Sequence, residues 1–259
     1  MSSLKGRTAL VTGGGTGIGQ AIAYDLADTG VKVTICGRRS GPLDDTVKTI
    51  TDKGGAANAI IADMTNPDEI EALADELIGS QDGVDIIVHN AGFSSKVRSA
   101  RYIGVEEWRS VMDVNTMGPA ILTRALLSPM IDKGSGDIIM ISSMAAIRPG
   151  VMAGVAYSAA KTAAKAYMEV LSMEVRRHGI RCTTIYPGEV DTPILDNRAL
   201  PPTAESRAIM MQSADISTAI MMALSLPKRA TVSEIALTAT IPRDMSEDIK
   251  AALSKKTPV

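Results

Sequence analysis

The sequence of 259 residues predicts an α/β protein with one doubly wound, Rossmann-type domain, in which helices cover both faces of a parallel sheet. Two observations carry this prediction. Short apolar runs, typical of buried parallel strands, alternate along the chain with longer segments of helical periodicity. A glycine-rich turn also follows the first apolar run and leads directly into the first helical segment, an order typical of doubly wound folds.

The elements follow in order from the N-terminus. Strands are expected at 8–12, 31–35, 59–61, 85–88, 137–141 and 180–186. Helices are expected from Ile18 to Leu26, over 43–53, from Asn66, over 108–131 and over 156–178. The helix at Asn66 has a capping side chain, then a proline in the first turn, then acids that the helix dipole favours. Because no linker or repeat interrupts the order, we predict one domain over residues 1–259.

Residues 190–212 break this rhythm. They contain Pro193, Pro201 and Pro202, and a helical stretch begins at Thr203. An insertion after a late strand lies beside the carboxyl ends of the sheet, where ligands bind in such folds. We expect a segment that covers the substrate, although a plain surface excursion would give the same pattern.

Composition limits the classes of function. A formal net charge of −2, with both signs interspersed, provides no basic surface for nucleic acid or lipid. Cys36 and Cys182 form neither a metal-ligand spacing nor a disulfide framework. The stretch 1–7 lacks the apolar core of a signal peptide, and no apolar run reaches the roughly 18 residues of a membrane span. We expect a cytoplasmic protein that uses no metal and binds neither nucleic acid nor membrane.

The glycine-rich turn spans Thr12 to Gly19. Glycines allow a tight turn and let backbone N–H groups approach a pyrophosphate, which the helix N-terminus stabilises. A glycine pattern alone is weak evidence, but its strand–turn–helix context predicts a nucleotide site. The expected contacts are Gly13, Thr16, Gly17, Ile18 and Gly19.

The end of the second strand indicates which nicotinamide cofactor is preferred. An acid at this point holds the ribose 2′-hydroxyl of NAD, whereas an arginine accommodates the 2′-phosphate of NADP. No acid follows the strand until Asp44, while Arg38 can present a planar fork to a phosphate and Arg39 can add a second charge. Two solvated arginines on a surface loop would look the same. We predict that NADP(H) is preferred over NAD(H).

Tyr157 and Lys161 lie four residues apart at the start of a helix, so their side chains share a face. A free tyrosine has a pKa of about 10, and an ammonium group within about 4–6 Å lowers it. Lys161 and the cationic nicotinamide ring together could bring the pKa of Tyr157 near 7. The pair follows the hydroxyls of Ser142 and Ser143 and lies downstream of a nucleotide turn, which predicts acid–base chemistry.

With these motifs the sequence resembles the short-chain dehydrogenase/reductase family, in its common short branch, from Lys5 to about Thr240. The resemblance implies a catalytic tetrad of Ser143, Tyr157, Lys161 and Asn115. In that tetrad Tyr157 is the acid and base, and Ser143 hydrogen-bonds the substrate oxygen. Lys161 lowers the tyrosine pKa and holds the nicotinamide ribose, and Asn115 holds a water near the lysine. The resemblance implies further cofactor contacts from Asp63, Met64, Asn90, Ala91, Gly92, Pro187, Gly188, Val190 and Thr192.

The substrate pocket is expected to be largely apolar, with little fixed charge. Its expected members are Ser143, Phe93, Ser94, Ser95, Met144, Met152, Ile194 and Leu195. Lys96, Arg98, Arg101 and Arg148 are close enough in sequence to bind an anionic group, and a solvated loop explains them equally well.

Three features depart from the family pattern. His89 stands where an asparagine is frequent, and we expect a buried core histidine. Ser143 precedes Tyr157 by 14 residues, which leaves open whether Ser142 or Ser143 faces the substrate; we expect Ser143. The tail from Glu234 lacks the glycine-rich ending that many members use in tetramer contacts. We expect a homo-oligomer, and the atypical tail leaves open whether it is a homodimer or a homotetramer.

The sequence as a whole predicts an oxidoreductase that transfers a hydride between NADP(H) and a carbonyl or secondary alcohol, with Tyr157 as acid and base. The alternative is a catalytically silent NADP-binding sensor or scaffold of the same fold. Such proteins usually lack a tetrad member, and all four are present here. A longer epimerase or dehydratase is disfavoured because the chain has little room for an additional substrate domain. The identity of the substrate stays open.

Overall fold

The computed structural model describes residues 4–256, apart from the side chain of Asn197, so the outermost residues of the predicted domain, 1–3 and 257–259, lie outside the described residues. Within them, seven parallel strands form one sheet in the order β3-β2-β1-β4-β5-β6-β7. The strands are β1 (Thr8–Thr12), β2 (Lys32–Gly37), β3 (Ala56–Ile61), β4 (Ile86–His89), β5 (Gly136–Ile141), β6 (Ile180–Pro187) and β7 (Glu234–Leu237). The doubly wound α/β fold predicted from the sequence is confirmed.

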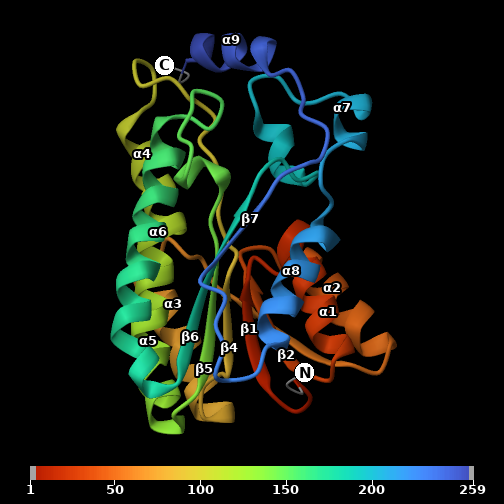
Figure 1. The fold of residues 1–259 in the computed structure, drawn as a ribbon, viewed down its shortest axis with the longest axis vertical. Coiled ribbons are helices and arrows are strands. Elements are labelled where there is room, and N and C mark those ends of the chain that lie inside the picture. The colour runs from red at the N-terminus through yellow and green to blue at the C-terminus, as the bar shows by residue number, and fades with distance from the viewer. Residues whose placement is uncertain (1–3, 257–259) are drawn as a thin grey trace.

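Helices cover both faces of the sheet (Figure 1). On one side lie α1 (Gly17–Asp28), α2 (Ser40–Asp52) and α8 (Ser213–Ser225), and on the other α3 (Pro67–Gln81), α4 (Val105–Met112), α5 (Gly118–Lys133) and α6 (Val155–Val175). The short α7 (Ala204–Ala208) and α9 (Ser246–Ser254) lie beyond one end of the sheet. No helix within residues 4–256 has the length and apolar character needed to cross a membrane.

The sheet separates two apolar cores. Successive residues of a strand point to opposite faces, so Val11 packs into the core beneath α1 and α8, whereas Leu10 packs into the core beneath α3, α5 and α6. All six residues of β5 are buried, as expected for a central strand of a parallel sheet. This rigid support fixes the loops at the strand ends.

The start of α3 agrees with its predicted signals. The Asn66 side chain accepts a hydrogen bond from the backbone N–H of Asp68, and Pro67 occupies the first helical position. Ile70, Leu73, Ala74 and Leu77 form its buried face. The cap and the apolar spacing therefore define this helix from sequence alone.

Three elements differ from the sequence prediction. The helix expected over 108–131 is divided by a π-helical turn, η1 (Asp113–Met117), between α4 and α5. The helix expected over 156–178 ends at Val175, because residues 176–178 form a 3-10 turn closed by Gly179 at φ 73°. The edge strand β7 was not expected, and it pairs with β6 in the register Ile185 to Ile235.

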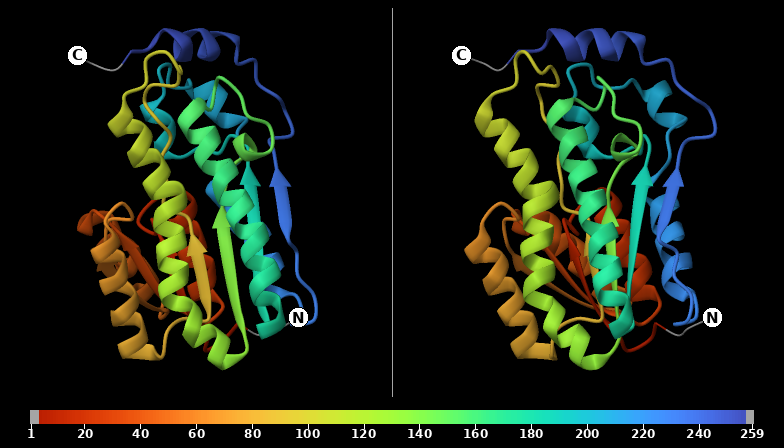
Figure 2. Two further views of the ribbon diagram at one scale, coloured as in Figure 1. Left: turned by 90° about the vertical axis from the view of Figure 1, so that its left-hand side faces the viewer. Right: turned by 60° about the vertical axis from the view of Figure 1, so that its left-hand side comes forward.

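The strands point toward the end of the molecule where α7 and α9 lie (Figure 2). The strands β2 and β3 are added on one side of β1, and the strands from β4 onward are added on the other side. The order of the strands therefore switches between β1 and β4, which are neighbours in the sheet but not in sequence. Such a switch point leaves a crevice outside the carboxyl ends of the strands. The predicted site residues follow these strand ends.

Candidate active site

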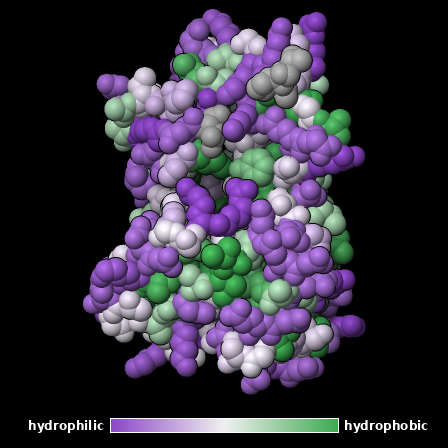
Figure 3. Space-filling model, turned by 180° about the vertical axis from the view of Figure 1, so that it is seen from behind, coloured by the Kyte–Doolittle hydropathy of each residue, from purple (hydrophilic) through white to green (hydrophobic). Residues whose placement is uncertain are grey.

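A cavity of about 920 Å³ lies at the carboxyl edge of the sheet. Figure 3 shows one face of the molecule hollowed between its upper and lower parts. The loops after β1 to β6 line the cavity, together with residues that lead into α9. Of the predicted catalytic and cofactor-binding residues, all but Gly19 and Asn115 line it.

The glycine-rich turn has the backbone that its sequence predicts. Gly13 and Gly17 adopt positive φ angles of 66° and 58°, which glycine tolerates best. A Cβ on Gly17 would lie 3.3 Å from the Cγ2 atom of Thr192 across the cavity. No acid occupies the first turn of α1, so its N-terminus stays attractive to an anion. These residues fit a dinucleotide diphosphate.

Gly19 has a different place from the one predicted. It is buried, and a Cβ there would collide with the side-chain amide of Asn90 and the carbonyl of Gly13. Gly19 is thus required by the close packing of α1 against the glycine-rich turn and the loop after β4, and it does not line the cavity.

The loop after β4 is tied to the glycine-rich turn by four hydrogen bonds. The Thr12 hydroxyl accepts from the backbone N–H groups of Asn90 (3.0 Å) and Ala91 (2.9 Å). The Asn90 amide in turn donates to the carbonyls of Thr12 (3.0 Å) and Gly13 (3.2 Å). These bonds fix the position of the loop after β4 relative to the glycine-rich turn.

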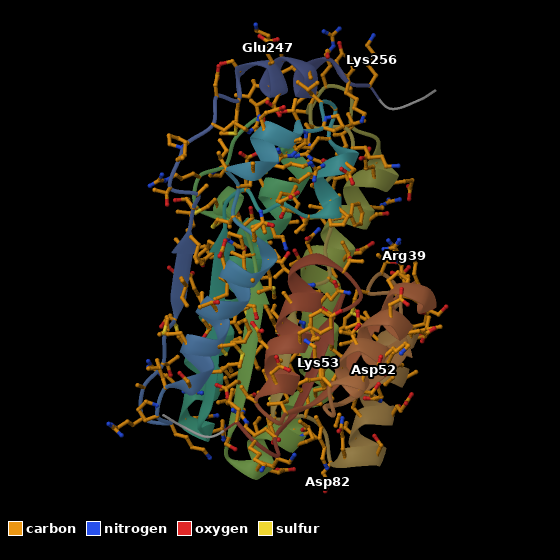
Figure 4. The ribbon with its side chains drawn as sticks, turned by 90° about the vertical axis from the view of Figure 1, so that its right-hand side faces the viewer. Arg39, Asp52, Lys53, Asp82, Glu247 and Lys256 are labelled. Carbon is orange, nitrogen blue, oxygen red and sulfur yellow. The ribbon has the colours of Figure 1, made fainter. Side chains whose placement is uncertain are left out.

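Arg38 and Arg39 stand at the end of β2 beside the cavity. The Arg38 guanidinium lies 3.9 Å from the Asp63 carboxylate and is 67% exposed, so a new ligand can reach it. Arg39 is the N-cap residue of α2, whose first turn has no acid. Figure 4 shows Arg39 at the end of α2 nearest the upper part of the molecule, with Asp52 and Lys53 toward the other end. The two positive side chains therefore lie beside a helix N-terminus.

Ser143 and Tyr157 meet at the reactive part of the cavity. Ser143 follows β5, Tyr157 lies in the first turn of α6, and their side chains share a hydrogen bond. Ser142 is buried and its hydroxyl donates to the backbone carbonyl of Lys161 at 3.3 Å. Ser143 is therefore the serine that contacts Tyr157.

Lys161 lies one turn beyond Tyr157 on the same face of α6. Its Nζ atom is 5.6 Å from the centroid of the Tyr157 ring and donates to the carbonyl of Ile141 at 2.8 Å. Lys161 is 3% exposed, and this burial lowers the pKa of its ammonium group to about 7. The lysine can therefore change its charge near neutral pH.

The pKa of Tyr157 differs from the sequence expectation. Burial raises it above the usual value, while the hydrogen bond with Ser143 and the positive charges of Arg98 and Arg198 partly offset this rise. The lowering expected from Lys161 does not appear within the protein, because the buried lysine itself loses its proton near pH 7. The protein's own groups hold Tyr157 as a phenol.

Asn115 lies in the π-helical turn η1 and does not line the cavity. Its amide nitrogen donates to the carbonyls of Phe93 (3.0 Å) and Val111 (2.8 Å), which fixes the direction of the side chain. Its Oδ1 atom is buried and has no hydrogen-bond partner among the described residues. A Cβ on Gly92 would lie 2.6 Å from this oxygen and 3.4 Å from the Lys161 Nζ atom. Glycine therefore leaves space between two polar atoms.

The walls beyond Tyr157 agree in part with the sequence prediction. Phe93, Ser94, Met144, Met152, Ile194 and Leu195 line the cavity, together with Arg98 and Arg148. Ser95 is fully buried elsewhere, and neither Lys96 nor Arg101 lines the cavity.

Sequence reasoning missed Glu189, Arg198 and Arg243. All three line the cavity, and Glu189 accepts hydrogen bonds from Arg198 (2.6 Å) and Arg243 (2.9 Å). Glu189 and Arg243 are 54 positions apart, so no local pattern links them. The sequence signal that could have indicated this site was the pair of opposite charges Glu189 and Arg198, which lie just before and within the proline-containing segment 190–212.

Comparisons with known proteins agree with this arrangement. The family described as short chain dehydrogenase matches residues 7–201. An uncharacterized oxidoreductase of Staphylococcus aureus strain USA300 is 33% identical over 237 residues, which cover 91% of this chain and 98% of the relative.

Two solved structures have the same fold. One is a metagenomic short-chain oxidoreductase in complex with NADP, with a TM-score of 0.81, 28% identity, and coverage of 93% of this chain and 100% of that chain. The other is a short chain dehydrogenase/reductase from Burkholderia phymatum in complex with NAD, with a TM-score of 0.81, 24% identity, and coverage of 91% and 90%. The chain therefore belongs to the short-chain dehydrogenase/reductase family of oxidoreductases.

Proposed function

We propose that the protein transfers a hydride between NADP(H) and a carbonyl or secondary alcohol, with Tyr157 as acid and base. The observation that carries this proposal is the grouping of Ser143, Tyr157 and Lys161 at the cavity, with the unpartnered Asn115 oxygen close to the Lys161 Nζ atom. When bound, the reduced nicotinamide supplies the hydride. The residues of the chain supply the proton and stabilise the charge that develops on oxygen.

Tyr157 donates its hydroxyl proton to the substrate oxygen as the carbonyl is reduced. Ser143 donates a second hydrogen bond to the same oxygen, a small preorganised oxyanion site. A tyrosine that burial keeps protonated suits this direction, because the acid must hold its proton until charge develops. In the oxidising direction the phenolate must accept a proton, and the nearby cations of Arg98 and Arg198 favour that form.

The proton is replaced through Lys161 and Asn115. The lysine has a pKa of about 7, so it can give or take a proton at working pH. The Asn115 Oδ1 atom is an acceptor without a protein partner, and it faces the space beside the Lys161 Nζ atom. A water held there would connect the lysine to solvent.

Cofactor binding involves the loops at the strand ends. The turn at Gly13, Thr16, Gly17 and Ile18 would hold the diphosphate, and Asp63 and Met64 the adenine. The loop of Asn90, Ala91 and Gly92 would line the cofactor, Lys161 would hold the nicotinamide ribose, and the nicotinamide would pack along Pro187, Gly188, Val190 and Thr192. The preference for NADP(H) rests on Arg38 and Arg39, whose charges lie beside the α2 N-terminus.

Residues 190–212 serve as the substrate-covering segment in this proposal. Ile194, Leu195 and Arg198 of this segment line the cavity. The segment is closed at its base, where the N–H of Asp191 donates to the carbonyl of Met211 at 2.8 Å. The two ends of the segment therefore meet, and the residues between them form a loop that borders the cavity.

Assembly and location stay proposals as well. The outer face of α6 exposes Val170 (64%) and Met173 (67%), an apolar surface that suits a second copy of the chain. We propose a homodimer or homotetramer, which light scattering of the purified protein would test, and a location in the cytoplasm, which cell fractionation would test.

Turnover separates an enzyme from a silent sensor or scaffold. A panel of ketones and alcohols is incubated with NADPH or NADP⁺, and the nicotinamide absorbance is followed for the wild type and Tyr157→Phe. We expect conversion by the wild type alone. Nucleotide binding without conversion of any compound, identical in both proteins, would favour the silent alternative.

A further inference from the structure

The side of the cavity beyond Tyr157 contains more positive than negative charge. Arg98, Arg148, Arg198 and Arg243 line it, against the single carboxylate of Glu189. Glu189 pairs with Arg198 and Arg243, and Arg243 also pairs with Asp248 at 2.8 Å. Arg98 and Arg148 have no carboxylate within 4.0 Å among residues 4–256.

Arg98 is the unusual member of this set, because it is only 6% exposed. Its Nη1 atom donates to the carbonyls of Met152 (2.6 Å) and Ala153 (3.0 Å), and its Nη2 atom donates to the Ser94 hydroxyl (2.9 Å). A guanidinium has five N–H donors, so these three bonds leave two donors unused. One of the two is the N–H of the Nε atom, which is buried and has no partner. All three acceptors are neutral. The contacts order the loop, and the Glu107 carboxylate, which lies more than 4.0 Å away, only partly offsets the positive charge of Arg98.

Arg98 is also fixed close to the reacting group. Its backbone carbonyl accepts from the N–H of Val155 at 3.2 Å, two residues before Tyr157 in the first turn of α6. Its charge is felt at the Tyr157 hydroxyl, whose pKa it lowers. Burial and the neighbouring Arg198 lower the pKa of Arg98 to about 10, so the side chain stays charged at neutral pH. A buried charge of this kind is costly unless an opposite charge binds beside it.

We propose that the substrate carries an oxyanion, most simply a carboxylate, which binds at Arg98 with Arg148 at the cavity rim while the oxygen of the substrate's carbonyl group faces the Tyr157 hydroxyl. The planar guanidinium matches the geometry of a carboxylate. Met152 and Leu195 border the same region, so the body of the substrate is apolar. This assignment rests on the proposed hydride transfer and narrows its substrate class to keto acids and hydroxy acids.

Binding is measured separately from turnover. The protein is saturated with NADP⁺, which cannot reduce a ketone, and is titrated calorimetrically with 3-acetylbenzoate and with its neutral counterpart 3-acetylbenzamide. We expect the carboxylate to bind at least about tenfold more tightly. Titration with 3-acetylphenyl phosphate and 3-acetylphenol separates a phosphate site from a carboxylate site. A preference for the phosphate alone would overturn the carboxylate assignment.

Two variants test Arg98 itself. In Arg98→Gln the ratio of the affinities for the carboxylate and the carboxamide should fall to about one. Arg98→Lys, which keeps a cation, should retain part of the wild-type ratio. Arg101→Gln is the matched control, since Arg101 lies three residues away and does not line the cavity. Thermal unfolding of each variant shows whether the fold persists.

The wild-type comparison is decisive even where a variant fails to fold. Equal affinities for the carboxylate and the carboxamide, or an unchanged preference in a folded Arg98→Gln, would overturn the assignment. Failure of NADP⁺ to bind in the first step would instead refute the proposed function.

Discussion

The Lys161 ammonium nitrogen lies 5.6 Å from the centre of the Tyr157 ring and is held there by a hydrogen bond to the carbonyl of Ile141. The two side chains share one face of α6 because they are four residues apart. Burial lowers the pKa of Lys161 and raises that of Tyr157. The pair thus places an acid that stays protonated beside a base that titrates near neutrality.

Replacing Tyr157 by Phe removes the proton donor and keeps the ring. We expect kcat to fall by several orders of magnitude, roughly 10³–10⁴-fold, while the dissociation constant for NADPH changes little. Steady-state kinetics and fluorescence titration measure the two quantities. Tyr24→Phe is the control, because Tyr24 lies on α1 outside the cavity. Reduction by Tyr157→Phe at near wild-type rate would exclude the tyrosine as the acid.

The burial of Lys161 should appear in the pH dependence of stability. Its pKa is about 7 in the folded protein and near 10.5 in the unfolded chain. Between these pH values the unfolded chain binds more protons than the folded protein, so the free energy of unfolding rises with pH. Below pH 7 the lysine is charged in both states, and the full cost of burying its charge then lowers the free energy of unfolding.

Lys161→Met removes this contribution. The variant should therefore gain stability relative to the wild type, on the order of 5 kcal/mol below pH 7, and the gain should vanish toward pH 10.5. Urea unfolding of the nucleotide-free proteins at several pH values measures it. Lys53→Met, at an exposed position, is the control. A difference that does not change with pH would show that Lys161 keeps its ordinary pKa.

The central strands and the glycine-rich turn could be predicted because their signals are local. An apolar run such as 137–141 is buried on both faces, and Asn66 with Pro67 starts a helix whatever surrounds it. The strand β7 gave no such signal. Glu234–Leu237 is half exposed, and it becomes a strand because β6 offers an unpaired edge.

The same distinction applies to the site. Tyr157 and Lys161 are recognisable from a spacing within one helix, whereas Arg98, Glu189 and Arg243 meet only through the tertiary fold. The break at Asp113–Met117 also escaped prediction, since a single π turn does not alter the apolar pattern of the flanking helices. The turn determines the position of the Asn115 side chain.

Arg38→Ala tests the preference for NADP(H). Loss of the guanidinium removes the group nearest to an expected 2′-phosphate, so the dissociation constant for NADPH should rise by about tenfold or more, with little change for NADH. Parallel fluorescence titrations with the two cofactors measure this ratio. Lys53→Ala, at the far end of α2, removes an equal charge as the control. Equal changes for both cofactors would show that Arg38 does not discriminate between them.

Glu189 should connect the cavity to the C-terminal segment. It accepts from Arg198 and Arg243, whose side chains are 14% and 12% exposed, and Arg243 reaches on to Asp248 in α9. Burial would raise the pKa of Glu189, but the hydrogen bonds from Arg243 and Arg198 outweigh it and hold the pKa below its usual value. The carboxylate therefore contributes stability above pH 4.5, and this contribution is lost as pH falls through the lower, folded-state pKa.

Glu189→Gln leaves two largely buried guanidinium groups short of a counter-charge, so we expect a loss of about 2–3 kcal/mol in the free energy of unfolding at pH 7. Glu247→Gln changes an exposed acid on α9 and should cost far less. If the network fastens α9 over the cavity, hydrogen exchange in 243–254 should quicken in Glu189→Gln and stay unchanged in Glu247→Gln. Combining Glu189→Gln with Arg243→Met should then cost less than the sum of the two single changes, because the second substitution removes the charge that the first left unpaired. Strict additivity would mean that Glu189 and Arg243 are neighbours without energetic coupling.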